Sequence, residues 1–82
     1  MSQARIALIH ATALAVDPIR DAFEAGWPQA RITHLLDDSL STDLALEGTI
    51  TERMIERFVT LARYSAECGA NAILFTCSAF GV

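Results

Sequence analysis

Residues 5–10 have the sequence RIALIH, a short apolar run that contains two β-branched isoleucines. Strands in the middle of a parallel sheet are buried on both faces, so their sequences are continuously apolar and do not alternate. The stretch therefore predicts a strand that is buried on both faces. The sequences RITHLL at residues 31–36 and AILFT at residues 72–76 predict a second strand and a third, buried strand.

A first helix is predicted between the first two strands. Asp17 and Pro18 form a helix-start signature, because an aspartate side chain caps free backbone N–H groups and proline is tolerated at the first helical position. Gly26 offers a left-handed residue at which this helix can stop.

A longer amphipathic helix is predicted before the third strand. Residues 49–52 (TITE) fit a capping box, and Gly69 ends the helix. Apolar residues recur there at steps of three and four, as in a helix packed on a core: Ile50, Met54, Phe58, Leu61, Ser65 and Cys68. Charged residues, Arg57 among them, cover the opposite face. Residues 40–48 are polar and weakly patterned, which predicts a loop.

The predicted order of elements is β-α-β-α-β. This alternation is typical of an α/β fold with a parallel sheet and right-handed crossovers. Ligands of such sheets bind beyond the carboxyl ends of the strands. Three segments follow the strands and are expected to converge there: His10-Ala11-Thr12, Asp37-Asp38-Ser39 and Thr76-Cys77-Ser78.

Cys77 is the sharpest functional candidate, because it directly follows the third strand. A thiol at a helix N-terminus is stabilised as the thiolate, and the thiolate is the form that acts as nucleophile or base. The alternative is a small, unreactive core cysteine. Cys68 lies on the apolar stripe and is expected to pack in the core. Nothing in the sequence supports a disulfide between the two.

Several polar residues could act beside Cys77. Thr12, Thr76 and Ser78 supply the hydroxyl groups that hold a carboxylate. His10 could orient or protonate a ligand near neutral pH, or it could simply bond to a neighbouring loop. His34, inside the second strand, is expected to be structural. The acidic pair at residues 37 and 38 could meet a substrate ammonium, and we favour a role in capping the turn.

Composition excludes several function classes. The 82 residues carry a net charge of −4, and the six basic residues are all Arg without a stripe, so nucleic-acid binding is not expected. No apolar run has the roughly 20 residues of a membrane span. No signal-peptide pattern is present and two cysteines are too few for a disulfide framework, so we expect a reducing cytoplasm. No spacing suggests a metal site, a dinucleotide-binding loop or a P-loop.

Three segments carry a family resemblance: RIALIHAT at residues 5–12, LLDDSLS at residues 35–41 and GANAILFTCSAFG at residues 69–81. Through them the chain resembles the aspartate/glutamate racemase superfamily, which includes hydantoin racemases, maleate isomerases and arylmalonate decarboxylases. The resemblance covers nearly all 82 residues but corresponds only to the first part of a typical member. The chain is therefore expected to be an N-terminal lobe, truncated before its next helix.

The resemblance implies a fold and a chemistry. Members have two α/β lobes, each a three-layer flavodoxin-like parallel sheet, and they work without pyridoxal phosphate or another cofactor. One cysteine from each lobe handles the proton on the carbon next to a carboxylate or carbonyl. By position, Cys77 matches the first-lobe cysteine, and Thr76 and Ser78 match flanking residues that bind the carboxylate. Residues 10–12, with His10 and Thr12, match the first substrate-binding loop.

The sequence also departs from the family. Ser78 and Ala79 stand where glutamate racemases commonly have Asn-Thr, so the substrate is left open beyond a small carboxylate. No second-lobe cysteine is present, so two-base racemisation by this chain alone is not expected. An exposed sheet edge leads us to expect a homo-oligomer. The alternatives are a one-cysteine decarboxylase or hydrolase, and a non-catalytic α/β module that binds a small molecule or a partner.

Overall fold

The computed structural model describes residues 4–76. Its elements follow in the order β1 (Arg5–His10), a 3-10 turn η1 (Ala13–Ala15), α1 (Val16–Gly26), β2 (Arg31–Leu36), α2 (Ser39–Glu47), α3 (Glu52–Glu67) and β3 (Ala72–Phe75). Within this part of the chain, no helix is long and apolar enough to cross a membrane.

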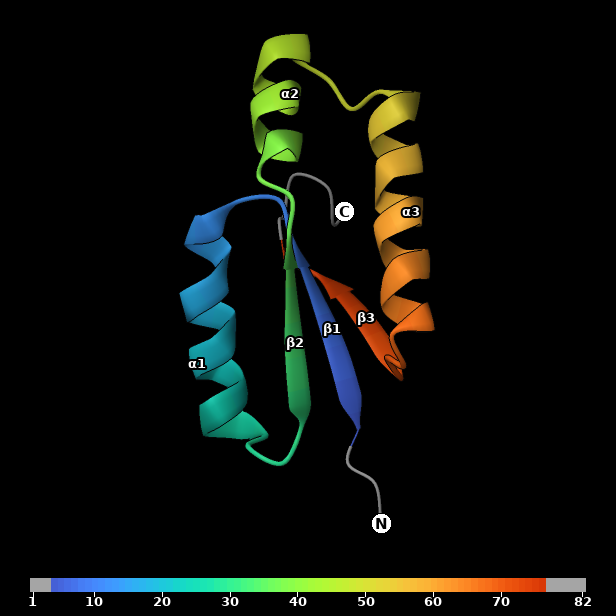
Figure 1. Ribbon diagram of the computed structural model, residues 1–82. Coiled ribbons are helices and arrows are strands. Elements are labelled where there is room, and N and C mark those ends of the chain that lie inside the picture. Colours follow the sequence, from blue (N-terminus) through green and yellow to red (C-terminus); the bar gives the residue numbers. More distant parts are fainter. Residues whose placement is uncertain (1–3, 77–82) are drawn as a thin grey trace.

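The three strands form one parallel sheet in the order β2-β1-β3. Helix α1 lies on one side of the sheet and α3 on the other, which makes three layers (Figure 1). The same order begins a flavodoxin-like sheet, in which the direction of strand addition reverses between β1 and β3. The predicted α/β class and parallel sheet are confirmed.

Central strand β1 is the buried heart of the fold. Residues 6–10 are all buried, and Leu8 is 0% exposed. Strands β2 and β3 are the two edges, and several of their residues are exposed. The prediction of a third buried strand is therefore wrong in its burial, because β3 has a paired neighbour on one side only among the described strands.

Helix α3 covers one face of the sheet with the predicted stripe. Met54 and Ser65 are buried, and the ring of Phe58 meets the ring of Phe75 edge-on at 5.0 Å between centroids. The ends of the stripe differ from the prediction, because Ile50 precedes the helix and Cys68 follows its last turn, and both are exposed.

Helix α1 begins and ends differently from the prediction. Its start is set by η1, where the Thr12 hydroxyl accepts a hydrogen bond from the Leu14 N–H at 3.4 Å. Asp17 therefore lies inside the first turn and pairs with Arg20 at 3.0 Å. Gly26 is the last helical residue and has no left-handed conformation. The helix stops at Trp27, since a residue before proline is disfavoured from helical angles.

Residues 39–47 form helix α2 where a loop was predicted. Leu40 is fully buried against Ala11 and Met54, and this tertiary contact anchors a segment whose local pattern is weak. Gly48 then ends the helix with a left-handed φ of 77°. The predicted capping box is also wrong: Thr51 caps α3, and its hydroxyl accepts from the Met54 N–H at 3.3 Å.

Candidate functional site

His10 is the centre of the polar groups at the carboxyl ends of the strands. It is the last residue of β1, and its side chain is 0% exposed. Its Nδ1 lies 2.6 Å from the Thr76 hydroxyl, and its Nε2 lies 2.9 Å from Nδ1 of His34. The three side chains form one hydrogen-bonded chain that crosses all three strands of the sheet.

The strand register explains why these side chains meet. Leu8 is opposite His34 on β2 and opposite Leu74 on β3. Side chains two residues apart lie on the same face of a strand, so His10, His34 and Thr76 share the face that α1 covers. The expected convergence of His10 and Thr76 is confirmed. His34, which was expected to be structural, also belongs to this cluster through its contact with His10.

The surroundings of His10 favour its neutral form. Burial lowers the pKa of His10 below its ordinary value, and the nearby charge of His34 lowers it further. A neutral imidazole donates through one nitrogen and accepts through the other, which suits the contacts to Thr76 and His34. Near neutral pH, His10 can therefore orient a hydroxyl group or pass on a proton, and it does not carry a fixed charge.

Thr76 is held against β1 by its backbone as well as by its side chain. Its N–H donates to the Ile9 carbonyl at 3.1 Å, which extends the β1–β3 pairing beyond Phe75. A hollow of about 340 Å³ opens beside it and is lined by residues of α1 and β3, including Pro18, Ile19 and Leu74. Cys77 and Ser78, the next residues in the sequence, lie outside the described residues.

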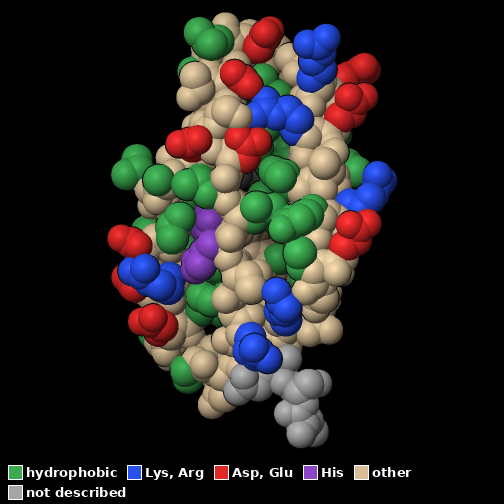
Figure 2. Space-filling model, in the orientation of Figure 1, with side chains coloured by type: hydrophobic (Ala, Val, Ile, Leu, Met, Phe, Trp, Pro, Cys, Tyr) green, Lys and Arg blue, Asp and Glu red, His purple; other side chains and the backbone are tan. Residues whose placement is uncertain are grey.

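The other predicted binding residue, Thr12, has a different observed role. Its hydroxyl caps η1 directly after β1. The loop thus stays at the carboxyl end of the sheet, as expected. A second hollow, of about 220 Å³, lies between α1 and β2 and is lined by Trp27 and His34 among others. Figure 2 shows the histidines (purple) in the furrow between α1 and the sheet.

The acidic turn after β2 is held by its own hydrogen bonds. The Asp37 N–H donates to the His10 carbonyl at 2.9 Å. The Asp37 carboxylate accepts from the hydroxyl and N–H of Ser39 and from Arg57. The Ser39 hydrogen bond, followed by the bond to Arg57 and its charge, lowers the pKa of Asp37 despite its partial burial. This arrangement agrees with the capping role that we favoured.

Arg57 on α3 is paired with α2 and with the turn after β2. It was not predicted as an important residue. One guanidinium nitrogen lies 2.6 Å from the Asp43 carboxylate on α2, and another lies 3.2 Å from Asp37. The hydrogen bond to Asp43 and the contacts with Asp37 raise the pKa of Arg57, whereas partial burial opposes the shift. Sequence analysis placed it only among the charged residues opposite the apolar stripe, and its pairing with Asp43 was missed because α2 was not predicted.

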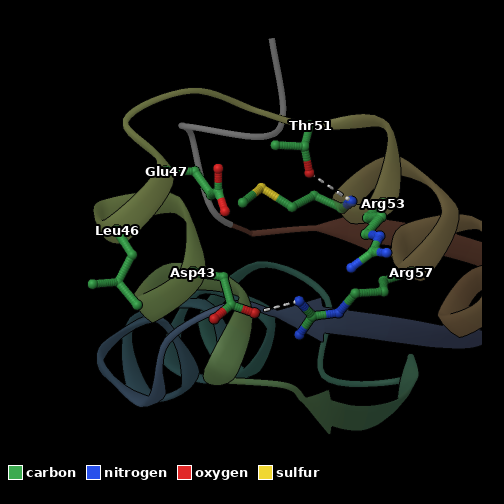
Figure 3. Close-up of a pocket in the computed structure, with 7 residues that line it drawn as sticks. Asp43, Leu46, Glu47, Thr51, Arg53 and Arg57 are labelled. Carbon is green, nitrogen blue, oxygen red and sulfur yellow. Dashed lines mark hydrogen bonds and ion pairs between the residues drawn. The ribbon is translucent and has the colours of Figure 1, made fainter.

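A hollow of about 470 Å³ lies between α2 and α3, away from the His10 cluster. Figure 3 shows Glu47 and Arg53 on its two sides, with Arg57 bonded to Asp43 at its edge. The charged residues that line this hollow are of both signs, and Arg57 is already paired with two carboxylates. The hollow therefore does not present one strong charge to a ligand.

Cys68 is not in the core as predicted. It lies at the C-cap of α3, is exposed, and forms no disulfide. The neighbouring Cys68 thiol raises the pKa of the Tyr64 phenol. The apolar stripe continues one residue past Glu67, the last residue of α3, so Cys68 lies where the helix has already ended.

Metal binding finds no support in residues 4–76, where no three His, Cys, Asp or Glu side chains are grouped as a metal site. Comparisons with protein-family models, with curated proteins and with solved structures find no match to this chain.

Proposed function

We propose that the chain is one lobe of a cofactor-independent isomerase of the aspartate/glutamate racemase type. The observation that supports it best is the contact between His10 and Thr76 at the carboxyl ends of β1 and β3. Ligands of open α/β sheets bind where the strand order reverses, which in this sheet is between β1 and β3. Cys77 follows Thr76 directly in the sequence.

In the proposed reaction, the Cys77 thiolate removes the proton from the carbon next to a carboxylate of a small substrate. The electron pair of the broken C–H bond moves into the carboxylate, and the sulfur becomes a thiol. Thr76, Ser78 and the Thr12 loop would hold the carboxylate through hydroxyl and N–H groups. His10 would keep the Thr76 hydroxyl in a fixed orientation. We also propose that the enzyme works in the cytoplasm.

The proposal that Cys77 is the one catalytic thiol of this chain has a testable consequence. A single thiol can remove and return a proton on one face of the substrate, whereas inversion needs a second group on the opposite face. We therefore expect no racemisation from this lobe alone, and we propose exchange of the substrate α-hydrogen with solvent, by a protein that contains this lobe, as the activity that reports on Cys77. In D₂O the thiol proton is replaced by deuterium, which is then delivered to the same carbon.

The experiment is NMR detection of α-deuterium incorporation into a panel of small amino and dicarboxylic acids. Cys77→Ser should lose about 10²-fold or more of the exchange rate, since the general base is removed. Cys68→Ser is the matched control and should retain it. Exchange that survives Cys77→Ser would contradict the assignment.

The same panel separates the alternatives. Carbon dioxide release without deuterium exchange would indicate a one-cysteine decarboxylase instead. Binding without any chemistry, seen as substrate-induced shifts of the His10 and Thr76 resonances, would indicate a non-catalytic module.

A further inference from the structure

His34 joins the buried histidine cluster to the surface of the molecule. His10 is fully buried, whereas His34 on strand β2 is exposed. His34 lines the hollow of about 220 Å³ between α1 and β2, together with Arg20 and Glu24 of α1. A flavodoxin-like sheet adds its later strands beyond β3, so β2 is also the outer strand of the lobe proposed above. The solvent side of His34 is therefore set by α1 and β2 themselves.

The two imidazole rings are aligned for proton transfer. Nε2 of His10 and Nδ1 of His34 are 2.9 Å apart, and the ring centroids are 5.1 Å apart with an angle of 21° between the ring planes. The centroid distance is close to the N···N distance plus two ring radii, so the rings meet edge to edge. The lone pair of one ring then points at the N–H of the other. On the inner side, Nδ1 of His10 lies 2.6 Å from the Thr76 hydroxyl.

Each member of this chain can accept a proton on one side and give one on the other. A neutral imidazole has one N–H and one lone pair, and a hydroxyl group both donates and accepts. The lowered pKa of His10 keeps its ring in this neutral form near neutral pH. Within residues 4–76 no protein group bonds to Nε2 of His34, so this nitrogen can exchange protons with water in the hollow.

We propose that His34, His10 and Thr76 form a proton relay between water in the hollow beside α1 and the carboxyl end of the sheet. Its use rests on the proposed function, because a thiol that has taken a substrate proton must release it and take up deuterium from D₂O. One proton passes outward through Thr76, His10 and His34 to water, and one deuteron then passes inward along the same groups. After both transfers each ring has its starting tautomer and no charge is left behind.

Exchange of the His10 ring N–H with water, measured by NMR, tests the relay without a substrate. His34→Gln keeps an amide beside His10 but has no imidazole to pass the proton on, so this exchange should slow about tenfold or more. Thr33→Val is the matched control, because the Thr33 side chain lies on the other face of β2, and it should leave the rate unchanged. Circular dichroism verifies the fold of both variants.

Chemical modification gives a second measurement that needs no variant. Diethyl pyrocarbonate acylates accessible imidazoles, so it reaches the exposed His34 before the buried His10. Acylation of Nε2 closes the outer end of the relay and should slow the exchange of the His10 N–H as His34→Gln does. Hydroxylamine, which removes the acyl group, should restore the rate.

An exchange rate of the His10 N–H that is equal or faster in His34→Gln and in the acylated chain would overturn the relay, because the proton then reaches water by another route. Substrate α-hydrogen exchange tests the proposed function separately. Substrate exchange that needs Cys77, without any effect of His34 on His10, contradicts the relay alone. An effect of His34 on His10, without substrate exchange in a protein that contains this lobe, supports the relay and contradicts the proposed function.

Discussion

A fully buried histidine at the end of the central strand is the distinctive residue of this protein. His10 has no exposed surface, and both of its ring nitrogens have hydrogen-bond partners. If both rings of the His10–His34 pair were doubly protonated, the two nitrogens that face each other at 2.9 Å would both be donors. The cluster therefore tolerates one added proton but not two.

The His10 environment predicts that stability falls in mild acid. The pKa of His10 is lowered in the folded state by burial and by His34, while the unfolded chain has the ordinary value of about 6.5. The unfolded state thus binds more protons below that pH. The stabilisation is fully present above about pH 6.5 and is lost as pH falls further.

Urea unfolding at several pH values between 8 and 5.5 measures this effect. His10→Gln should flatten the dependence, whatever its effect on the absolute free energy of unfolding. The charged groups Arg20 and Glu24 of α1 line the hollow beside His34 and are unchanged in this variant. An equal slope in both proteins would show that His10 does not control it.

The sequence could predict the meeting of His10 and Thr76 but not their third partner. Parallel strands bring their carboxyl ends to one edge of the sheet, so residues at the ends of two such strands are expected to lie near one another, and the register then decides whether their side chains share a face. His34 joins the cluster only because it pairs opposite Leu8. That register depends on the packing of the whole sheet, and a shift of one residue would turn His34 to the other face.

Among the elements, the helix termini were the hardest to predict. Thr49 and Thr51 both precede the long helix, and the spacing to Glu52 favoured Thr49. In the structure Thr51 has the extended backbone of an N-cap, and its hydroxyl bonds to Met54. Helix α2 was missed because serine, threonine and aspartate compete with helical hydrogen bonding in an isolated segment. Burial of Leu40 overrides that local preference.

The two threonines give a matched test of the cap. Thr51→Ala should lower the free energy of unfolding by about 1 kcal/mol, since an N–H at the start of α3 loses its partner. Thr49→Ala removes the same atoms two residues earlier and should change it by less than about 0.5 kcal/mol. Thermal or urea unfolding measures both, and the reverse order of effects would restore the capping box.

At the scale of the whole molecule, the sheet is buried in its centre and open at both edges of the described part. All three strands have apolar sequences, and this pattern predicted their existence and parallel arrangement. It could not separate central β1 from its neighbours, because the exposure of an edge residue such as Leu74 depends on what lies beside the strand. The hydrogen-bonded cluster of His10, His34 and Thr76 lies at the carboxyl end of the best-buried strand.

The most direct test of the central claim is the pH dependence of Cys77 alkylation. In the Cys68→Ser chain, Cys77 is the single remaining thiol, so the rate of reaction with iodoacetamide reports on it alone. The account predicts a thiol that ionises well below the ordinary value of about 8.5 and that small dicarboxylates protect. A Cys77 that ionises near that value, or reacts no faster than Cys68 in the Cys77→Ser chain, would contradict an acid/base role.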